Sequence, residues 1–296
     1  MHSSWLLLLA ATAAAAVQTR DIFRAGFHRP LPELCPARGE STRLLVLVAS
    51  APGHAARREA IRLTWGHFLN RRDLAFAFML GDAKETRALK DEQHTWGDLI
   101  VAKSPDGYPM LGLKTLHMLE WVLLYCPLAP RLLKTDDDVF VNMPYLLQFI
   151  SDTAGGRGAV WGTVEAKGTP EREHVPTSIY PYPIYPPHAR GAAYLMTTDL
   201  VLPLLRAALG APYLPHEAVL VTGMLLHNVS AELVHVPGFT AYSADDGDAL
   251  RLVALHGLHS RRLLSCWRRV FEALYDYVLT QDPDDIADPV IRETFI

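Results

Sequence analysis

Three consecutive acidic residues, Asp136, Asp137 and Asp138, carry the strongest chemical signal in the chain. In an extended segment, side chains two positions apart point to the same side, so Asp136 and Asp138 can meet one cation while Asp137 faces elsewhere. Carboxylate oxygens suit hard divalent cations such as Mg²⁺ and Mn²⁺. Apolar runs flank the triplet, and three carboxylates held between them repel one another unless a cation neutralises them. The alternative is a solvated acidic turn that caps a helix starting near Asn142.

The triplet follows a short apolar run in a chain where strand patterns alternate with helix patterns. Strands are expected at residues 44–48, 74–80, 98–102, 131–134 and 192–197, and helices at 54–68, 83–94, 111–125, 199–209, 217–227 and 260–279. This alternation predicts the α/β class, with a Rossmann-like, mostly parallel sheet flanked by helices. Ligands of such sheets bind at the carboxyl ends of strands, where the triplet falls. A long Pro- and Tyr-rich loop is expected over residues 163–190, and loops of that length are usually functional or disordered.

The composition limits the class of protein. The chain has 296 residues, half of them hydrophobic, which is enough for one large α/β domain or two small ones. The net charge is −4 and no Lys/Arg-rich stripe stands out, so no nucleic-acid partner is expected. Three cysteines, Cys35, Cys126 and Cys266, allow at most one disulfide, and the alternative is three ordinary buried thiols. The absence of HExxH, GxSxG and Walker-type glycine loops argues against the common hydrolases.

The N-terminus carries an apolar block, Trp5 to Val17, that is shorter than the about 20 residues of a membrane-spanning helix. We therefore expect residues 1–17 to be a signal peptide or a short membrane anchor. Residues 18–42 lack an apolar period and are expected to be a stem or linker, followed by one catalytic domain over residues 43–296. Asn228 begins a glycosylation sequon, which agrees with the secretory pathway, although sequons also occur by chance.

Ordered sequence blocks between residues 43 and 270 resemble the β-1,3-glycosyltransferase family, glycosyltransferase family 31. This family includes β-1,3-galactosyltransferases and β-1,3-N-acetylglucosaminyltransferases. The blocks are RREAIRLTWG at 57–66, FMLG at 78–81, GDLI at 97–100, DGY at 106–108, LKTL at 113–116, CP at 126–127, KTDDDVFVN at 134–142 and YPP at 185–187, followed by Gly191 and Tyr194. Each block alone is weak, whereas the ordered set is specific.

The resemblance implies a GT-A fold for residues 43–296 and an inverting transfer in β-1,3 linkage with Mn²⁺ as cofactor. The donor would be UDP-galactose or UDP-N-acetylglucosamine, and the acceptor would be a glycan on protein or lipid. The resemblance also implies a single-pass type II protein of the Golgi membrane with a lumenal catalytic domain, and a cleaved signal peptide stays open as an alternative.

The same resemblance assigns roles to individual residues. Asp136 and Asp138 match the family's metal-binding positions, and His256 matches a further metal or diphosphate contact, with an ordinary surface histidine as the alternative. The positions that match the binding site for the UDP-sugar are Arg58, Arg62, Trp65, Lys114, Asp136 and Asp137.

The expected catalytic base departs from the family pattern. The resemblance places the base in an acidic pair Glu-Asp, but this chain has Glu217 followed by Ala218, and alanine cannot accept a proton. Either Glu217 is the catalytic base, or the chain is catalytically silent and binds UDP-sugar or glycan. His216 is a further candidate because imidazole titrates near neutral pH, and Glu217 could alternatively complement a helix dipole. A second departure adds Arg190 close to the expected acceptor cleft.

Overall fold

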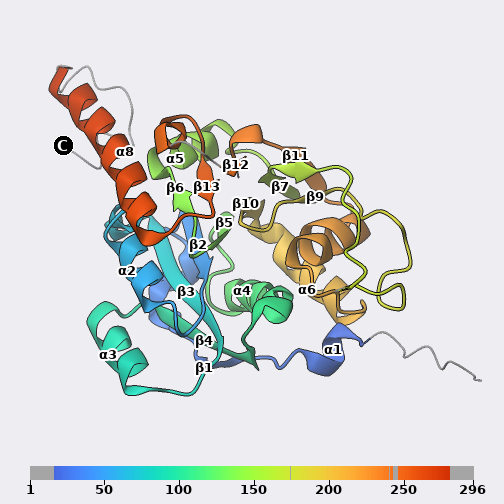
Figure 1. The fold of residues 1–296 in the computed structure, drawn as a ribbon. Coiled ribbons are helices and arrows are strands. Elements are labelled where there is room, and N and C mark those ends of the chain that lie inside the picture. The colour runs from blue at the N-terminus through green and yellow to red at the C-terminus, as the bar shows by residue number, and fades with distance from the viewer. Residues whose placement is uncertain (1–16, 174, 240, 243–245, 281–296) are drawn as a thin grey trace, which may run out of the picture.

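The computed structural model describes residues 17–173, 175–239, 241–242 and 246–280 (Figure 1). The expected signal peptide or anchor lies outside the described residues except for Val17. Within the described part of the chain, no helix is both long and apolar enough to cross a membrane.

One eight-stranded sheet forms the centre of the molecule, in the order β1-β4-β3-β2-β5-β10-β7-β11. Its strands are β1 (Phe27–Arg29), β2 (Leu44–Ala49), β3 (Leu74–Asp82), β4 (Leu99–Pro105), β5 (Arg131–Asp136), β7 (Ala159–Gly162), β10 (Ala193–Thr197) and β11 (Glu232–His235). Strands β4, β3, β2 and β5 are parallel, whereas β10 runs antiparallel to both β5 and β7, and β1 runs antiparallel to β4. The predicted α/β class with a mostly parallel sheet is therefore confirmed.

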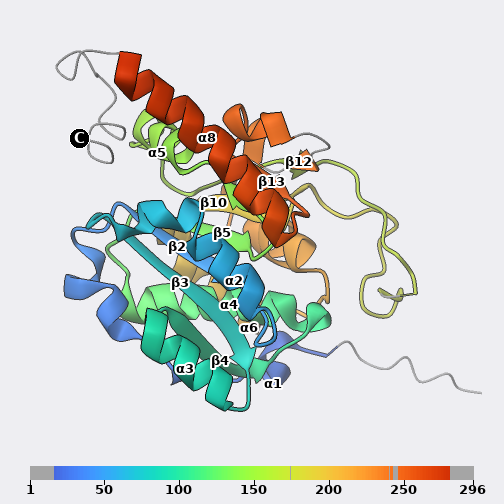
Figure 2. The same ribbon diagram turned by 60° about the vertical axis from the view of Figure 1, so that its left-hand side comes forward.

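Both faces of this sheet are covered by helices, so its central strands are apolar on both sides. In β2, Leu45 and Leu47 face the core formed with α4 (Leu111–Tyr125) and α6 (Val201–Leu209). Leu44 and Val46 face the opposite core. That second core is completed by α2 (Ala55–Arg62), α5 (Met143–Asp152) and α8 (Ser260–Thr280), with Leu89 added from α3 (Arg87–Trp96) (Figure 2).

Two small sheets and the remaining short helices complete the fold. The first small sheet has the order β12-β13-β6, and the second pairs β8 with β9. Their bounds are β6 (Phe140–Val141), β8 (Val164–Glu165), β9 (His188–Ala189), β12 (Ala241–Tyr242) and β13 (Ala254–His256), and the helices are α1 (Thr19–Ile22), α3 (Arg87–Trp96), α7 (Leu226–Asn228) and a π-helix (Val219–Leu225). The helix predicted at 217–227 is thus mainly a π-helix. The antiparallel pairing of β13 with β6 brings the C-terminal part of the chain back to the acidic triplet.

The segment expected as a stem packs against the domain. Strand β1 pairs with β4 at the edge of the main sheet, because β4 offers unpaired backbone groups there. Cys35 forms a disulfide with Cys126, across 91 positions of sequence. Cys266 is a buried free thiol in α8. Of the two possibilities left by the sequence, one bridge and one free thiol is the arrangement found.

Helix ends near the site follow from local sequence. The Asn142 side chain accepts a hydrogen bond from the Tyr145 backbone N–H and so caps α5 directly after the acidic block. The Thr86 side chain caps α3 in the same way through the Leu89 N–H. Gly97, with φ of 67°, ends α3 in the left-handed conformation that glycine adopts readily.

Candidate active site

The acidic triplet lies at the carboxyl end of β5. Asp136 is the last residue of that strand, and Asp137 and Asp138 follow in a turn. The alternation that would place Asp136 and Asp138 on one side therefore ends at Asp136. The Asp136 Oδ1 accepts a hydrogen bond from the Lys134 Nζ at 2.7 Å. Each of the three carboxylates consequently has a different set of partners.

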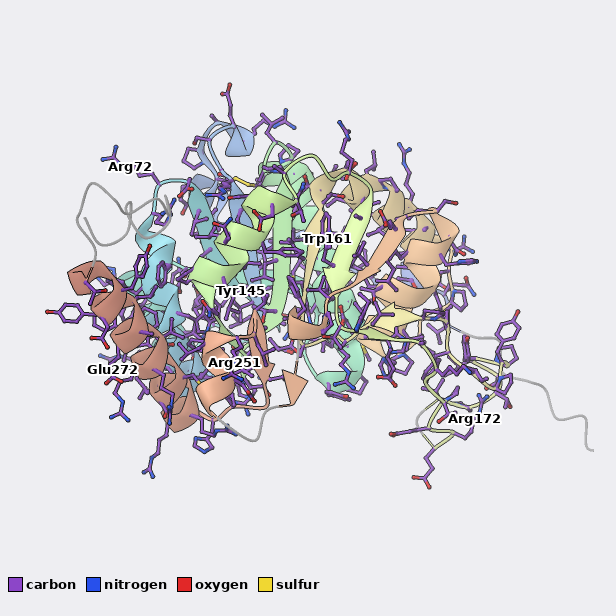
Figure 3. The ribbon with its side chains drawn as sticks, turned by 90° about the horizontal axis from the view of Figure 1, so that it is seen from above. Arg72, Tyr145, Trp161, Arg172, Arg251 and Glu272 are labelled. Atoms are coloured by element: carbon purple, nitrogen blue, oxygen red, sulfur yellow. A yellow bond between two sulfur atoms is a disulfide. The ribbon has the colours of Figure 1, made fainter. Side chains whose placement is uncertain are left out.

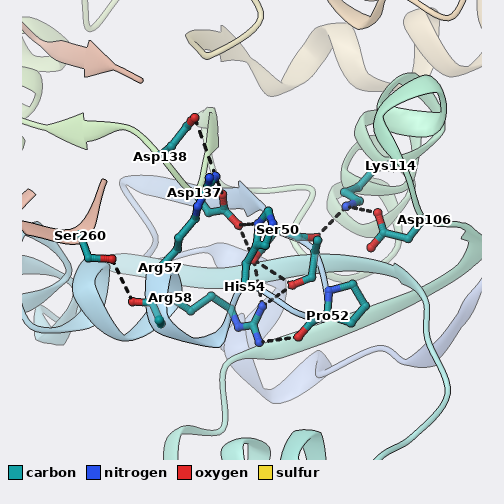
Figure 4. A network of polar contacts seen from close by, with 12 residues as sticks. Ser50, Pro52, His54, Arg57, Arg58, Asp106, Lys114, Asp137, Asp138 and Ser260 are labelled. Carbon is teal, nitrogen blue, oxygen red and sulfur yellow. Dashed lines mark hydrogen bonds and ion pairs between the residues drawn. The ribbon is translucent and has the colours of Figure 1, made fainter. Parts of the chain in front are cut away.

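Asp137 is buried and is held by the loop that follows β2 (Figure 4). One oxygen, Oδ2, lies 2.7 Å from the Ser50 hydroxyl, which donates to it, and 2.7 Å from the His54 Nδ1. The other oxygen accepts from Arg57 at 3.0 Å, and the same guanidinium nitrogen lies 3.8 Å from the Asp138 Oδ2. Parallel pairing of β2 with β5 brings Asp137 next to the loop that follows β2, because the carboxyl ends of the two strands share one edge of the sheet.

His256 reaches Asp138 through the small sheet. Beyond β13, the Leu258 N–H donates to the Asp138 carbonyl at 2.9 Å, and the His256 Nε2 lies 3.5 Å from the Asp138 Oδ1. Burial lowers the pKa of His256, and the nearby Lys134 and Arg190 charges lower it further, although Asp138 opposes them. The imidazole is thus kept neutral, the form that binds metals. Among the described residues, no group of three His, Cys, Asp or Glu side chains could hold a metal ion.

Three residues expected at the nucleotide, Arg58, Arg62 and Trp65, have polar groups that are bound by other parts of the protein. The Arg58 side chain is fully buried and donates to the Ser50 hydroxyl, two backbone carbonyls of the following turn, and both oxygens of Glu92. Arg62 donates to Glu92 and to both oxygens of Asp98. The buried Trp65 indole donates to the Val139 carbonyl at 3.0 Å. Their contacts fix the turn after β2 and the chain after the triplet.

Lys114 joins the ends of three neighbouring strands. Its ammonium group donates to the Ser50 carbonyl at 2.6 Å and to the Asp106 Oδ1 at 2.7 Å (Figure 4). The other Asp106 oxygen accepts from the Gly81 N–H at 3.2 Å. These bonds hold together the end of β3 and the segments that follow β2 and β4, and they place Lys114 beside the turn that also binds Asp137.

Glu217 is enclosed next to the triplet, with only 3% of its side chain exposed. Its Oε1 accepts hydrogen bonds from the Thr115 hydroxyl at 3.0 Å and the Tyr194 hydroxyl at 2.8 Å. Its Oε2 lies 3.7 Å from the Lys134 Nζ and is buried without a hydrogen-bond partner. Burial raises the pKa of Asp136 to about 6; the charges of Glu217 and Asp138 add to this effect, and Lys134 opposes it.

The neighbours of Glu217 offer no second acid. Ala218 is buried, and its carbonyl accepts a hydrogen bond from the Thr222 hydroxyl within the π-helix. His216 is exposed at the helix start, and its Nδ1 accepts the Val219 N–H at 3.4 Å. Although much of the residue is exposed, the ring is partly desolvated by its neighbours, and this desolvation together with the charge of His188 lowers the pKa of His216. Glu217 and His216 are adjacent in the chain, but Glu217 is enclosed whereas His216 is exposed.

Sequence reasoning did not select Ser50, His54, Arg57 or Asp106, which hold Asp137 and Lys114. Arg57 and Asp106 lie inside blocks that carried the family resemblance, and that was the available signal. Asn228, the predicted glycosylation position, ends α7 with an exposed side chain.

A cleft of about 740 Å³ lies between α2 and α3. Ala55, Glu59 and Arg62 line it from one face of α2, as their spacing of four and three residues requires. Arg57 leaves α2 on a different face to reach Asp137. Pro52 and Gly53 also line the cleft, so it borders the turn after β2 whose Ser50 binds Asp137.

Comparison with known proteins gives one consistent result. The profile of the family described as Galactosyltransferase matches residues 56–237. Beta-1,3-galactosyltransferase 4 of Rattus norvegicus is 34% identical over 256 residues, which covers 73% of this chain and 69% of that protein. UDP-GalNAc:beta-1,3-N-acetylgalactosaminyltransferase 1 of Homo sapiens is 29% identical over 267 residues, 83% of this chain and 80% of that protein. A solved glycosyltransferase involved in glycosylation of the major capsid of PBCV-1 is 13% identical, with a TM-score of 0.47 over 75% of this chain and 98% of that one.

Proposed function

We propose, from the premise that this chain belongs to the galactosyltransferase family and is a hexosyltransferase, that it moves galactose from UDP-galactose to a glycan hydroxyl in β-1,3 linkage with inversion. Two of its relatives are named as β-1,3-transferases of galactose and of N-acetylgalactosamine. The observation that carries the proposal is the acidic triplet at the end of β5, joined by β13 to His256. UDP-N-acetylglucosamine is the alternative donor that the experiment includes.

Mn²⁺ is proposed as the cofactor, held by Asp138 and His256. A carboxylate and a neutral imidazole 3.5 Å apart are a donor pair that suits a divalent ion, with diphosphate oxygens and water as the other ligands. Such an ion neutralises the negative charge that develops on the departing diphosphate. Arg57, between Asp137 and Asp138, would add a fixed positive charge at the same place. Asp136, Asp137 and Lys114 would surround the remainder of the nucleotide-sugar.

Arg58, Arg62 and Trp65 would support the nucleotide site indirectly. Because their polar atoms are bound by protein groups, we propose that they position the turn at residues 50–53 and the chain beyond Asp138 rather than contact UDP. Loss of any of them would therefore disturb both stability and donor binding.

Glu217 is proposed as the base that takes the proton of the acceptor hydroxyl. A buried oxygen without a hydrogen-bond donor is rare in folded proteins and often marks a functional group. The Oε2 of Glu217 is such an atom, and an acceptor hydroxyl would supply the missing donor. The Lys134 ammonium group lies 3.7 Å from the same oxygen, so a positive charge stands beside the proposed base. Gly191 lies directly against this oxygen, because a Cβ at position 191 would be 2.7 Å from the Glu217 Oε2.

The disulfide and the glycosylation position indicate the cellular compartment of the protein. A disulfide between Cys35 and Cys126 forms and persists in an oxidising environment such as the secretory pathway. The exposed side chain of Asn228 is open to glycosylation there. We therefore propose a lumenal enzyme of the Golgi, held by its N-terminal segment in a type II orientation, with a catalytic domain that includes strand β1 and Cys35 as well as residues 43–296.

Acceptor-dependent release of UDP tests the proposal. Wild type, Asp138→Asn and Glu217→Gln would be incubated with Mn²⁺, UDP-galactose or UDP-N-acetylglucosamine, and a panel of β-linked sugar acceptors. We expect release with UDP-galactose in the wild type and none in Asp138→Asn. Glu217→Gln should lower kcat by about 10²–10⁴-fold with little change in UDP binding, as loss of a general base does. Wild-type kcat in Glu217→Gln would refute its role as base.

A catalytically silent protein that binds UDP-sugar is the second candidate, and Ala218 is the observation that favours it. Ala218→Asp restores the second acid of the family pattern. If the wild type binds UDP and Mn²⁺ in a calorimeter but releases no UDP, and Ala218→Asp does release it, the silent alternative is correct. Activity in the wild type rules it out.

A further inference from the structure

The long loop between β8 and β9 has a definite shape that its own side chains impose. Arg172 donates hydrogen bonds to the carbonyls of Tyr180 and Tyr182, each at 2.6 Å. The Tyr180 hydroxyl donates to the Ile184 carbonyl at 3.0 Å, and the Tyr185 N–H donates to the Gly168 carbonyl. Figure 3 shows Arg172 on this loop, at the side of the molecule and away from its centre. The loop is therefore an ordered projection whose carbonyls are clamped by one guanidinium group.

Aromatic rings connect this loop to the proposed catalytic base. The Tyr182 and Tyr180 ring centroids are 5.4 Å apart, those of Tyr180 and Tyr185 are 5.2 Å apart, and those of Tyr185 and His216 are 5.5 Å apart. Rings at such separations make favourable edge-to-face or tilted contacts. His216 directly precedes Glu217 in the chain. The row of rings thus extends from the loop surface to the residue next to the base.

The outer end of this row is exposed although its inner part is buried. Tyr180 and Tyr185 are buried, whereas Tyr182 is 64% exposed and Ile184 is 48% exposed. Isolated exposed apolar residues are common. Here, however, the two side chains stand on a clamped loop rich in proline, so little conformational entropy would be lost when a ligand packs against them. Neither side chain carries a charge, and the apolar C–H face of a sugar ring packs well on an aromatic ring.

We propose that Tyr182 and Ile184, positioned by Arg172, form an outer acceptor subsite for a neutral oligosaccharide. The subsite would bind a sugar unit beyond the one that receives the hexose, while the reacting unit lies near His216 and Glu217. This inference rests on the proposed function, because Glu217 defines where the reacting hydroxyl must lie. It makes the loop a determinant of acceptor length.

Acceptors of two lengths test the subsite. The wild type, Tyr182→Ala and Tyr182→Phe would be assayed with a monosaccharide glycoside and with a tetrasaccharide that ends in the same sugar. Tyr275→Ala is the matched control, because Tyr275 is a 52% exposed tyrosine on α8, outside the loop. Kinetics would be measured by UDP release, and tetrasaccharide binding would be measured by calorimetry with UDP and Mn²⁺ present.

We expect Tyr182→Ala to raise the KM and the Kd for the tetrasaccharide about tenfold, the equivalent of one aromatic contact. Its kcat and its KM for the monosaccharide should stay at wild-type values. Tyr182→Phe keeps the ring and should behave like the wild type, as should Tyr275→Ala. Equal increases in KM for both acceptors, or an unchanged Kd for the tetrasaccharide, would overturn the subsite.

Failure of the subsite is distinguishable from failure of the proposed function. If the wild type glycosylates no acceptor, the proposed function fails, and the calorimetric Kd values of the wild type and Tyr182→Ala still decide whether the loop binds a glycan. If the wild type does not bind the tetrasaccharide, the proposed subsite is overturned. Far-ultraviolet circular dichroism of each variant confirms that the fold is retained.

Discussion

Gly191→Ala tests the enclosure of Glu217 with the smallest change that the site allows. A Cβ at this position would lie 2.7 Å from the Glu217 Oε2, whereas ordinary contacts of a Cβ begin at 3.4 Å. Gly191 does not have a positive φ, so alanine costs nothing in backbone conformation there. The steric contact with one carboxylate oxygen is therefore the main effect of the substitution.

The magnitude follows from what must move. Either Glu217 shifts and weakens its hydrogen bonds from Thr115 and Tyr194, or the turn at residues 190–192 shifts and weakens the bond from Lys134 to the Gly191 carbonyl. Hydrogen bonds to charged groups contribute about 1.5–3 kcal/mol each. We expect a loss of about 2–4 kcal/mol in the free energy of unfolding and a Tm lower by about 4–15 °C. A misplaced base should also lower kcat about 100-fold.

Two measurements on one preparation check this expectation. Thermal unfolding gives Tm, and UDP release at saturating donor gives kcat. Gly155→Ala is the matched control, because no atom lies within 4 Å of the Cβ position of Gly155. A Gly191→Ala protein with both the Tm and the kcat of the wild type would show that the enclosure of Glu217 by the turn has no energetic or catalytic consequence.

Three further predictions concern the surroundings of the site. Burial alone would raise the pKa of Glu92, but hydrogen bonds and charges from Arg58 and Arg62 outweigh it and lower the pKa. Glu92 therefore stabilises the fold in full above its unfolded pKa of about 4.3 and loses this effect as the pH falls through the folded pKa. Glu92→Gln should have a lower Tm at pH 7 and a shallower decline between about pH 5 and 3, and parallel melting curves against pH would contradict this. His256→Ala should weaken binding of UDP with Mn²⁺ at least about tenfold by calorimetry, while binding without the ion changes little; equal losses would exclude His256 as a ligand. Cys126→Ala removes a disulfide that closes a long loop and should cost about 2–5 kcal/mol in denaturant unfolding, with no further effect of a reducing agent.

The sequence predicted the buried elements well because their signals are local. The run at 44–48 is β2, the run at 74–80 lies within β3, and the helix predicted at 111–125 is α4 with the same bounds. Strands β7 and β11 were not predicted. Each has four residues, and the half-exposed β11 has a polar residue at each end and only two apolar residues between them, so its extended shape depends on pairing with β7.

The acidic residues of the candidate site could be predicted from the sequence, but the residues that contact them could not. The triplet is recognisable because it is continuous in sequence and ends a strand. Its contacts are not local: Asp137 is bound by residues 80 to 87 positions away, and this proximity arises from the pairing of β2 with β5. The partners of Arg58 could not be predicted either. Its positive side chain lies in a family block and was expected at the nucleotide, and in the structure it is fully buried and donates to protein acceptors.

Lys134 gives a physical reason why the acid missing at Ala218 matters. The buried ammonium group of Lys134 already serves Asp136 at 2.7 Å and Glu217 at 3.7 Å, and although burial lowers its pKa, these charges outweigh burial and raise the pKa. A third carboxylate at position 218 would add negative charge beside Glu217 without a new cation, and like charges in a buried site oppose ionisation. Ala218→Asp should therefore lower stability even where it raises transfer, a combination that is typical of residues kept for function. An Ala218→Asp protein that gains activity and keeps the wild-type Tm would show that the carboxylate at 218 points into solvent, and that the buried charges around Lys134 do not sense it.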